Sequence, residues 1–384
     1  MDFTYDDEQI ALRDSVRSLV GKAYADFGQR REIVATEPGY DEGLWRKFAE
    51  MGLLGLPFSE EDGGMGAGAV EVGLVSAELG RVLAPEPFLS MVVMAGGAVA
   101  AAGTAQQRAD VLPALVAGER ILALAHDEPG RRWVTTAKGV TAAESQGSWL
   151  LTGTKEPVLH GARADQLVVS AALPAGGTGL FLVDGDATGL VRSGYATYEG
   201  GRAAHIALND TPATPLGKPG ADQSTVIGSV LDHARMAICH EALGAMDVAL
   251  STTTEYLKSR KQFGVPLSTF QALTFRASDM YVSLELTRSI VLWATMVLAD
   301  ADGDPGGASQ AVARASLQVS RASRHLGQEA IQLHGGIAMT AEYLVGNLTA
   351  RLTVLDHLLG DGRHHLARLA AGVSEYASVE PLDS

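Results

Sequence analysis

The hydrophobic period of this chain changes twice, and this change constrains the fold more than any other feature. Apolar residues recur at helical spacing across residues 12–20, 40–55 and 70–84. From residue 121 the pattern is typical of short strands, and after residue 220 long helical stretches return. We therefore predict an α+β protein with an N-terminal helical domain, a middle β domain and a C-terminal helical bundle, spanning residues 1–120, 121–220 and 221–384.

The middle and last parts differ in the length of their predicted elements. Short runs rich in Val, Leu and Ile are separated by Gly, Asp and Pro, which favours an antiparallel barrel or sandwich without crossover helices. These runs are residues 149–161, 166–173, 179–186, 188–194 and 202–210. The later stretches 225–260, 270–300 and 309–336 are long enough for a four-helix bundle.

Composition excludes several classes of partner and site. The 384 residues are 46% hydrophobic, which is enough for a large core, and the net charge of −15 argues against nucleic acid or an anionic membrane. The single cysteine, Cys239, excludes disulfide frameworks and Cys-based zinc sites. The acidic start is unlike a signal peptide, and we find no run of about 18 apolar residues. We expect a cytoplasmic protein with no membrane partner.

Two adjacent histidines, His364 and His365, raise the question of a metal site. Neighbouring residues on a helix point about 100° apart, and no further ligand stands at a suitable spacing. We predict a helix-capping or helix-face role for them and no metal.

Two motifs stand at predicted helix ends. RKQFGVPLSTFQ, residues 260–271, separates two long helices, and QLHGGIAMT, residues 332–340, ends another. Two consecutive glycines at a helix end let backbone approach a phosphate closely. Either motif alone is compatible with an ordinary turn.

Together these motifs resemble those of the acyl-CoA dehydrogenase family, over the whole chain. The family signature R-x-x-F-G…Q matches Arg260, Phe263 and Gln271, and the signature Q-x-x-G-G matches Gln332, Gly335 and Gly336. The resemblance implies an FAD enzyme that removes hydrogen from an acyl-CoA thioester, with electron-transferring flavoprotein as acceptor. It also implies that these six residues contact the FAD held by a neighbouring subunit.

The segment LDHAR carries a further pair. Asp232 and Arg235 are three residues apart and therefore share a helix face. The resemblance implies that they bind substrate, whereas an ordinary surface ion pair is the alternative.

The position of the catalytic base departs from the family. The resemblance implies a glutamate at one of two positions, and this chain has Leu359 at one and Ala234 at the other. Neither side chain accepts a proton. Asp361 and Glu241 are nearby acids, of which Asp361 is a weak candidate base.

The side that holds the flavin departs as well. Asp127 stands where the family usually has threonine, Pro157 where it has tryptophan and Leu159 where it has threonine. Contacts within the chain's own site are thus lost, while those to a neighbour's FAD are kept. This asymmetry resembles the small, non-catalytic subunits of heteromeric bacterial acyl-CoA dehydrogenases that degrade steroid side chains or pimelate.

We therefore expect a subunit that completes the FAD site of a homologous partner carrying the glutamate. Two alternatives remain open. One is a self-sufficient homo-oligomer with an unusual base, and the other is a scaffold subunit without flavin.

Overall fold

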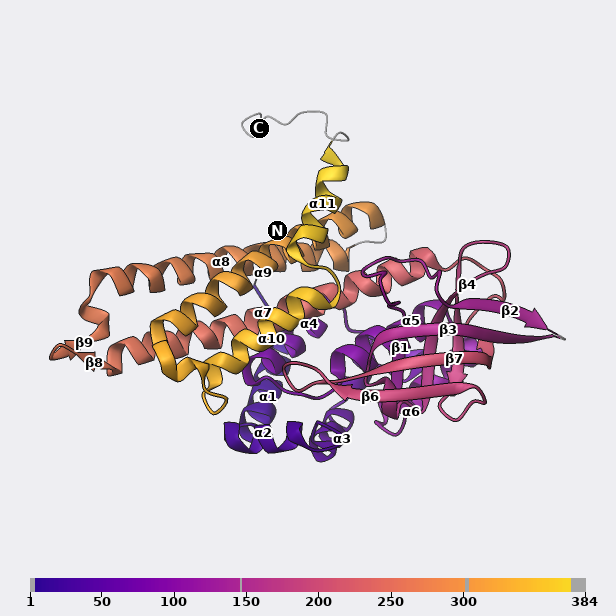
Figure 1. The fold of residues 1–384 in the computed structure, drawn as a ribbon, viewed down its shortest axis with the longest axis horizontal. Helices are drawn as coiled ribbons and strands as arrows, with labels where there is room; N and C mark the ends of the chain where they lie inside the picture. The colour runs from indigo at the N-terminus through magenta and orange to yellow at the C-terminus, as the bar shows by residue number, and fades with distance from the viewer. Residues whose placement is uncertain (1–3, 146, 301–303, 374–384) are drawn as a thin grey trace.

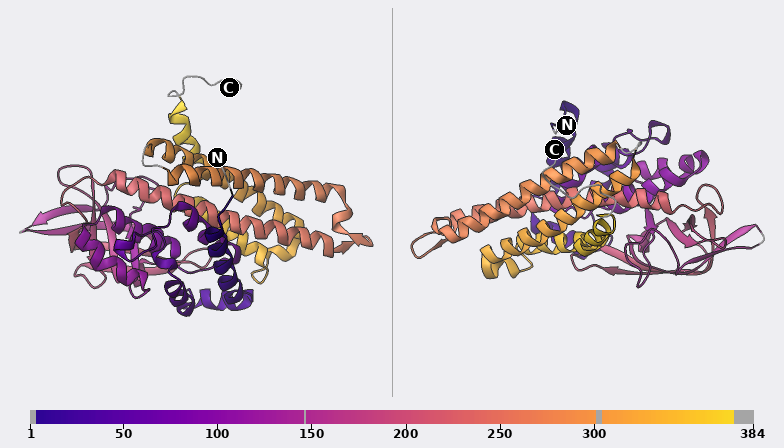
Figure 2. Two further views of the ribbon diagram at one scale, coloured as in Figure 1. Left: turned by 180° about the vertical axis from the view of Figure 1, so that it is seen from behind. Right: turned by 90° about the horizontal axis from the view of Figure 1, so that it is seen from above.

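The computed structural model describes residues 4–145, 147–300 and 304–373. Helices occupy both ends of the chain and a sheet occupies the middle, as predicted (Figure 1). The sheet lies at one end of the long C-terminal helices, and the β8–β9 hairpin lies at the other end in every view (Figures 1 and 2).

The N-terminal part consists of short helices. They are α1 (Asp7–Ala23), α2 (Phe27–Ala35), α3 (Glu42–Glu50), η1 (Leu53–Gly55), η2 (Glu60–Asp62), α4 (Ala69–Val82), η3 (Phe88–Gly96), α5 (Gly97–Ala102) and α6 (Ala105–Val116). The segment η3 is a π-helix and is almost entirely buried.

The middle part is a mixed sheet. Its strands are β1 (Leu122–Ala125), β2 (Thr141–Ser145), β3 (Ser148–Leu159), β4 (Gln166–Ala172), β5 (Thr178–Asp184), β6 (Leu190–Ala196) and β7 (Arg202–Pro215), with η4 (Gly161–Arg163) between β3 and β4. The order is β1-β4-β2-β3-β7-β5, with β6 paired to β7 and a further β4–β5 pairing.

The prediction of an antiparallel barrel or sandwich needs correction in this part. β1 pairs with β4 in parallel, and β2 meets β4 in parallel at a single registered pair, Thr141 with Ala172. The β2–β3 hairpin and η4 supply the connection that a parallel pair needs, so no crossover helix is required. The sheet curls, but such a short junction does not close it as a barrel.

The C-terminal part is a helical bundle. Its elements are α7 (Ser224–Ser259), β8 (Lys261–Gln262), β9 (Val265–Pro266), η5 (Leu267–Thr269), α8 (Gln271–Ala299), α9 (Pro305–His334), η7 (Gly335–Met339), α10 (Leu344–Leu358) and α11 (Gly362–Ala371). Helices α7, α8, α9 and α10 pack together, and α11 packs on α9.

Helix α7 joins the bundle to the N-terminal helices. It packs against α4 through two glycines that permit close approach of the backbones. A Cβ atom on Gly80 would lie 2.0 Å from the Glu241 carbonyl oxygen, and one on Gly244 would lie 1.9 Å from that of Ala77. The two helical parts therefore share one continuous hydrophobic core, and the sheet has its own around Trp149, Phe181 and Ile206.

Helix α8 is the most apolar long helix among the described residues. By length and composition alone it could cross a membrane, with a mean hydropathy of 1.4 over an 18-residue window. About a third of that window, 33%, is buried within the chain. The rest of that window is at least partly exposed on this chain.

Candidate functional site

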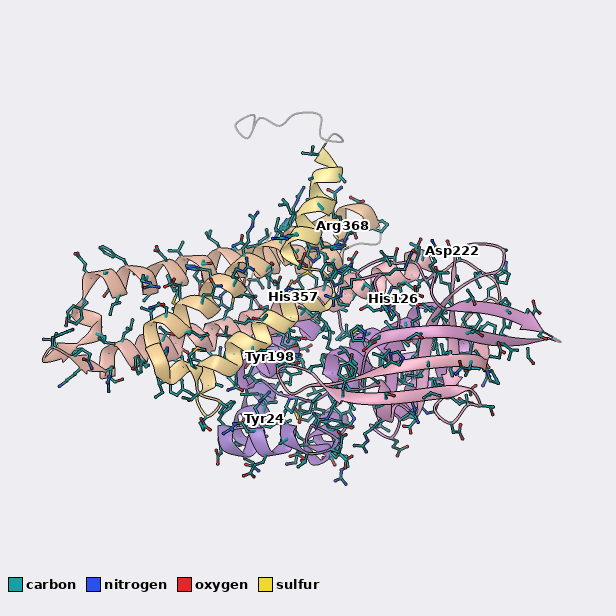
Figure 3. All side chains as sticks on the ribbon, in the orientation of Figure 1. Tyr24, His126, Tyr198, Asp222, His357 and Arg368 are labelled. Atoms are coloured by element: carbon teal, nitrogen blue, oxygen red, sulfur yellow. The ribbon has the colours of Figure 1, made fainter. Side chains whose placement is uncertain are left out.

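A cleft of about 480 Å³ lies where the sheet meets the helices. Its walls come from α2, residues 83–90, the end of β3, the β6–β7 loop, α10 and the loop after β1. Tyr198 of the β6–β7 loop and His357 of α10 belong to two of these walls (Figure 3). Much of the lining is apolar and includes Leu83, Leu89 and Val354.

A buried ion pair fixes the loop after β1. Lys155 has no exposed surface, and its Nζ donates to Glu128 Oε1, the His126 carbonyl oxygen and Ser170 Oγ, each at 2.9 Å. Burial alone would raise the pKa of Glu128. The Gly139 backbone N–H and the Lys155 ammonium outweigh that effect and lower the pKa to about 2. The loop that forms one wall of the cleft is therefore held from inside the sheet.

The three predicted departures on the flavin side all line this cleft. Asp127 comes from the loop, and Pro157 and Leu159 come from the end of β3. Burial raises the pKa of the Asp127 carboxyl to about 6, against the opposing effect of the Lys155 ammonium. An acidic side chain thus stands beside two apolar, non-aromatic side chains.

Trp133 closes one side of the cleft. Its φ of +64° is in the left-handed region, which is unusual for a bulky residue. The indole Nε1 donates to the His357 carbonyl oxygen at 3.1 Å, and the ring lies 5.4 Å from that of His364. These contacts join the sheet to the end of α10 and to α11.

Neither of the two positions at which the resemblance implies a glutamate holds a carboxylate. Ala234 is fully buried in α7, and Leu359 is 6% exposed just after α10. Asp361 caps α11, where its carboxylate accepts the His364 N–H at 2.8 Å. Glu241 accepts from Arg351 Nε at 2.7 Å.

Asp232 and Arg235 are buried and paired. Arg235 Nη1 donates to Asp232 Oδ1 at 2.8 Å, and Arg235 Nε donates to the Leu359 carbonyl oxygen at 2.9 Å. Asp232 also accepts from the Ser309 hydroxyl, and Arg368 lies 3.7 Å away. The pair links α7, α9 and α11 and does not line the cleft, so its role in substrate binding stays a prediction.

The six predicted FAD contacts gather at the end of the bundle that carries the β8–β9 hairpin, which we call the far end. Arg260, Phe263, Gln271, Gln332, Gly335 and Gly336 are all exposed. The ring of Tyr256, at the end of α7, lies 4.4 Å from that of His334, at the end of α9, and this contact brings the two motifs together. Phe263 is 91% exposed at the β8–β9 turn, and none of the six lines the cleft.

One constellation at the cleft is absent from the sequence prediction. Arg351 of α10 binds Glu241 of α7 at 2.7 Å and Glu199 of the β6–β7 loop at 2.9 Å. The partners are 110 and 152 residues away along the chain, so local periodicity gives no signal for it. The only hint is a charged residue within the apolar run LTARLTVL.

Family models match both helical parts. Residues 6–119 match the acyl-CoA dehydrogenase N-terminal domain, and residues 224–374 match the acyl-CoA dehydrogenase C-terminal domain. The chain belongs to the acyl-CoA dehydrogenase family. Enzymes of this family are flavin-dependent oxidoreductases that act on CH–CH bonds.

Relatives cover nearly the whole chain. Acyl-CoA dehydrogenase IpdE2 of Mycobacterium tuberculosis is 31% identical over 96% of this chain and 98% of its own length. Acyl-CoA dehydrogenase FadE27 of the same organism is 29% identical over 98% of this chain and 99% of its own length.

Two solved structures of similar chains carry the names of two proteins each. The steroid ACAD Tcur3481-Tcur3483 matches at a TM-score of 0.86 and 34% identity, over 96% of this chain and 98% of the other. The ChsE4-ChsE5 complex from Mycobacterium tuberculosis matches at a TM-score of 0.88 and 28% identity, over 98% of this chain and 100% of the other.

Homologues in this family bind FAD, and the residues of this chain fit FAD in one place and not in another. At the far end, Arg260 has no side-chain partner among the described residues, and a Cβ atom on Gly336 would meet nothing within 4 Å. A cation and open backbone suit a pyrophosphate. In the cleft, the acidic Asp127 and the absence of a stacking ring or hydroxyl at Pro157 and Leu159 do not suit an electron-rich isoalloxazine.

Proposed function

We propose that this chain is one subunit of a heteromeric FAD-dependent acyl-CoA dehydrogenase. It completes the FAD site of a homologous partner, and the partner carries the catalytic glutamate. The observation that carries the proposal is the position of the six predicted FAD contacts, at the end of the bundle that carries the β8–β9 hairpin and outside the lining of the chain's own cleft. A cofactor that touches Arg260 and Gln332 therefore lies against another chain.

The chemistry supports a division of labour. Dehydrogenation of an acyl thioester needs a carboxylate beside the acidic α-carbon, while FAD supplies the hydride acceptor. Leu359 and Ala234 cannot take that proton, and Asp361 is committed to the N-terminus of α11. The base therefore comes from the partner.

A subunit interface also explains the exposed apolar face of α8. Phe275, Val282 and Leu286 are 59%, 53% and 61% exposed. Spacings of seven and four residues put them on one side of the helix, as a stripe that a second chain can cover. The complexes ChsE4-ChsE5 and Tcur3481-Tcur3483 support this reading. We extend the proposal to a cytoplasmic location and to electron-transferring flavoprotein as the electron acceptor.

Co-expression tests the proposal. The chain is purified alone and with a homologous acyl-CoA dehydrogenase encoded beside it, and bound flavin and bleaching by acyl-CoA are measured. Flavin that appears only in the complex supports the proposal. A yellow chain that is bleached on its own favours a self-sufficient enzyme, and a colourless complex favours a scaffold.

The variant Arg260→Ala tests the FAD contact itself. In the complex it should raise the Kd for FAD roughly tenfold, because a charge-assisted hydrogen bond to phosphate is lost. Arg46→Ala, at an exposed position of α3, is the matched control. Equal FAD retention in both variants would show that Arg260 does not touch the cofactor.

A further inference from the structure

We propose that the cleft of this chain is a ligand site of its own, which binds an uncharged, mostly apolar molecule through a hydroxyl group that donates to Asp127. The ligand is not the flavin, and the inference does not rest on the partner subunit. It concerns a cavity that persists in a chain without a base at either family position.

The size and lining of the cleft indicate a small molecule. About 480 Å³ falls within the range of ligand pockets, roughly 300–1,000 Å³. Leu83, Leu89, Leu159, Val354 and Leu358 give an apolar surface from three separate elements. Such surface is stabilised when an apolar group displaces water from it.

Besides Glu86, whose buried Oε2 has no hydrogen-bond partner among the described residues, Asp127 has spare bonding capacity in this lining. Its carboxylate accepts the backbone N–H of Trp133, and among the described residues it forms no ion pair. An ionised carboxylate has about four lone-pair sites, so at least one more donor can bind. A partly buried carboxylate without a full set of donors is costly, and a ligand donor would offset that cost.

The charges around Asp127 select a neutral donor. Lys155, Arg235 and Arg132 all act on its carboxylate. The lining carries charges of both signs, Arg30, Arg132, Arg202 and Arg351 against Glu86, Asp127 and Glu199, so it favours neither a cationic nor an anionic ligand. A hydroxyl group carries no charge and donates one hydrogen bond.

The fluorescence of Trp133 can report on binding in the cleft. Trp133 lines the cleft and is held to α10 by its bond to the His357 carbonyl oxygen. A ligand that enters the cleft changes the surroundings of this indole. Trp133→Phe removes that signal and identifies its source.

The test compares two probes of equal carbon number, 1-decanol and methyl nonyl ether, on the full chain. Both are apolar and uncharged, but only the alcohol can donate a hydrogen bond. Titration followed by tryptophan fluorescence and by calorimetry should give an affinity for the alcohol roughly 10-fold to 100-fold higher, because its donor meets a charged acceptor. Equal affinities, or no binding of either probe, would overturn the proposal.

Variants assign the contact. Asp127→Leu should bind both probes equally, and Asp127→Asn, which keeps the shape and a weaker acceptor, should show a reduced preference. Leu89→Trp should fill the cleft and abolish the binding of both probes. Circular dichroism confirms that each variant folds, and the asparagine variant decides the case if the leucine variant does not fold. A full preference retained in Asp127→Asn and Asp127→Leu would place the hydroxyl elsewhere and reject the assignment.

Discussion

Lys155 shows how one buried charge organises a wall of the cleft. Its ammonium has no exposed surface and three acceptors at 2.9 Å. Lys155→Met would remove the buried cation of Glu128 and leave only the partly exposed Arg131 at 3.6 Å, at a cost of about 3 kcal/mol in the free energy of unfolding. Urea denaturation followed by circular dichroism measures this. The double variant Lys155→Met/Glu128→Gln should lose less than the two single variants combined, because the residues are in contact.

Glu128 also makes stability depend on pH. The pKa of Glu128 falls from 4.5 to about 2 on folding. Between these two pH values the unfolded chain therefore binds more protons than the folded chain. The stabilisation is therefore complete above about pH 5 and is lost as the pH falls from there through about 2. Urea midpoints across this window should fall more steeply for the wild type than for Glu128→Gln. Parallel curves would exclude Glu128 as a source of the acid sensitivity.

At the level of single residues, the sequence shows which chemical groups are present but not which distant groups they meet. Leu359 and Ala234 are alkyl side chains wherever they point, while their match to the family's base positions stays a prediction. The ion pairs of Arg351 could not be predicted from the sequence, because they depend on which distant elements come together in the fold. The left-handed backbone at Trp133 was unreadable for a related reason, because its contacts are to α10 and α11.

Among the secondary-structure elements, α8 carries a surface that its own bundle does not cover. Val282→Lys/Leu286→Lys places two charges on the exposed stripe. We expect little change in the stability of the single chain, within about 0.5 kcal/mol, and loss of assembly with the partner. Light scattering on the co-expressed complex measures the assembly, and Ala109→Lys on exposed α6 is the control. An intact complex would mean that another face makes the interface.

Element order and type were predictable, but strand direction was not. Helical and strand periods in the sequence locate the three parts, because side-chain burial repeats with the backbone geometry. The parallel contact of β1 with β4 arises because the β2–β3 hairpin and η4 bring the chain back to the same edge. The local sequence pattern does not show which distant strands pair, so it predicts an antiparallel sheet.

At the scale of the whole molecule, the two ends of the bundle give the last prediction. The exposed Arg260 and Gly336 at the β8–β9 end suit a pyrophosphate, whereas Asp127, Pro157 and Leu159 in the cleft do not suit an isoalloxazine ring. A complex of this chain with one catalytic partner should therefore hold one FAD per two chains. Flavin absorbance after denaturation, divided by protein concentration, gives this ratio. A ratio of two per pair would mean that the cleft accepts the ring despite Asp127, whereas a ratio near zero would mean that the far end completes no flavin site.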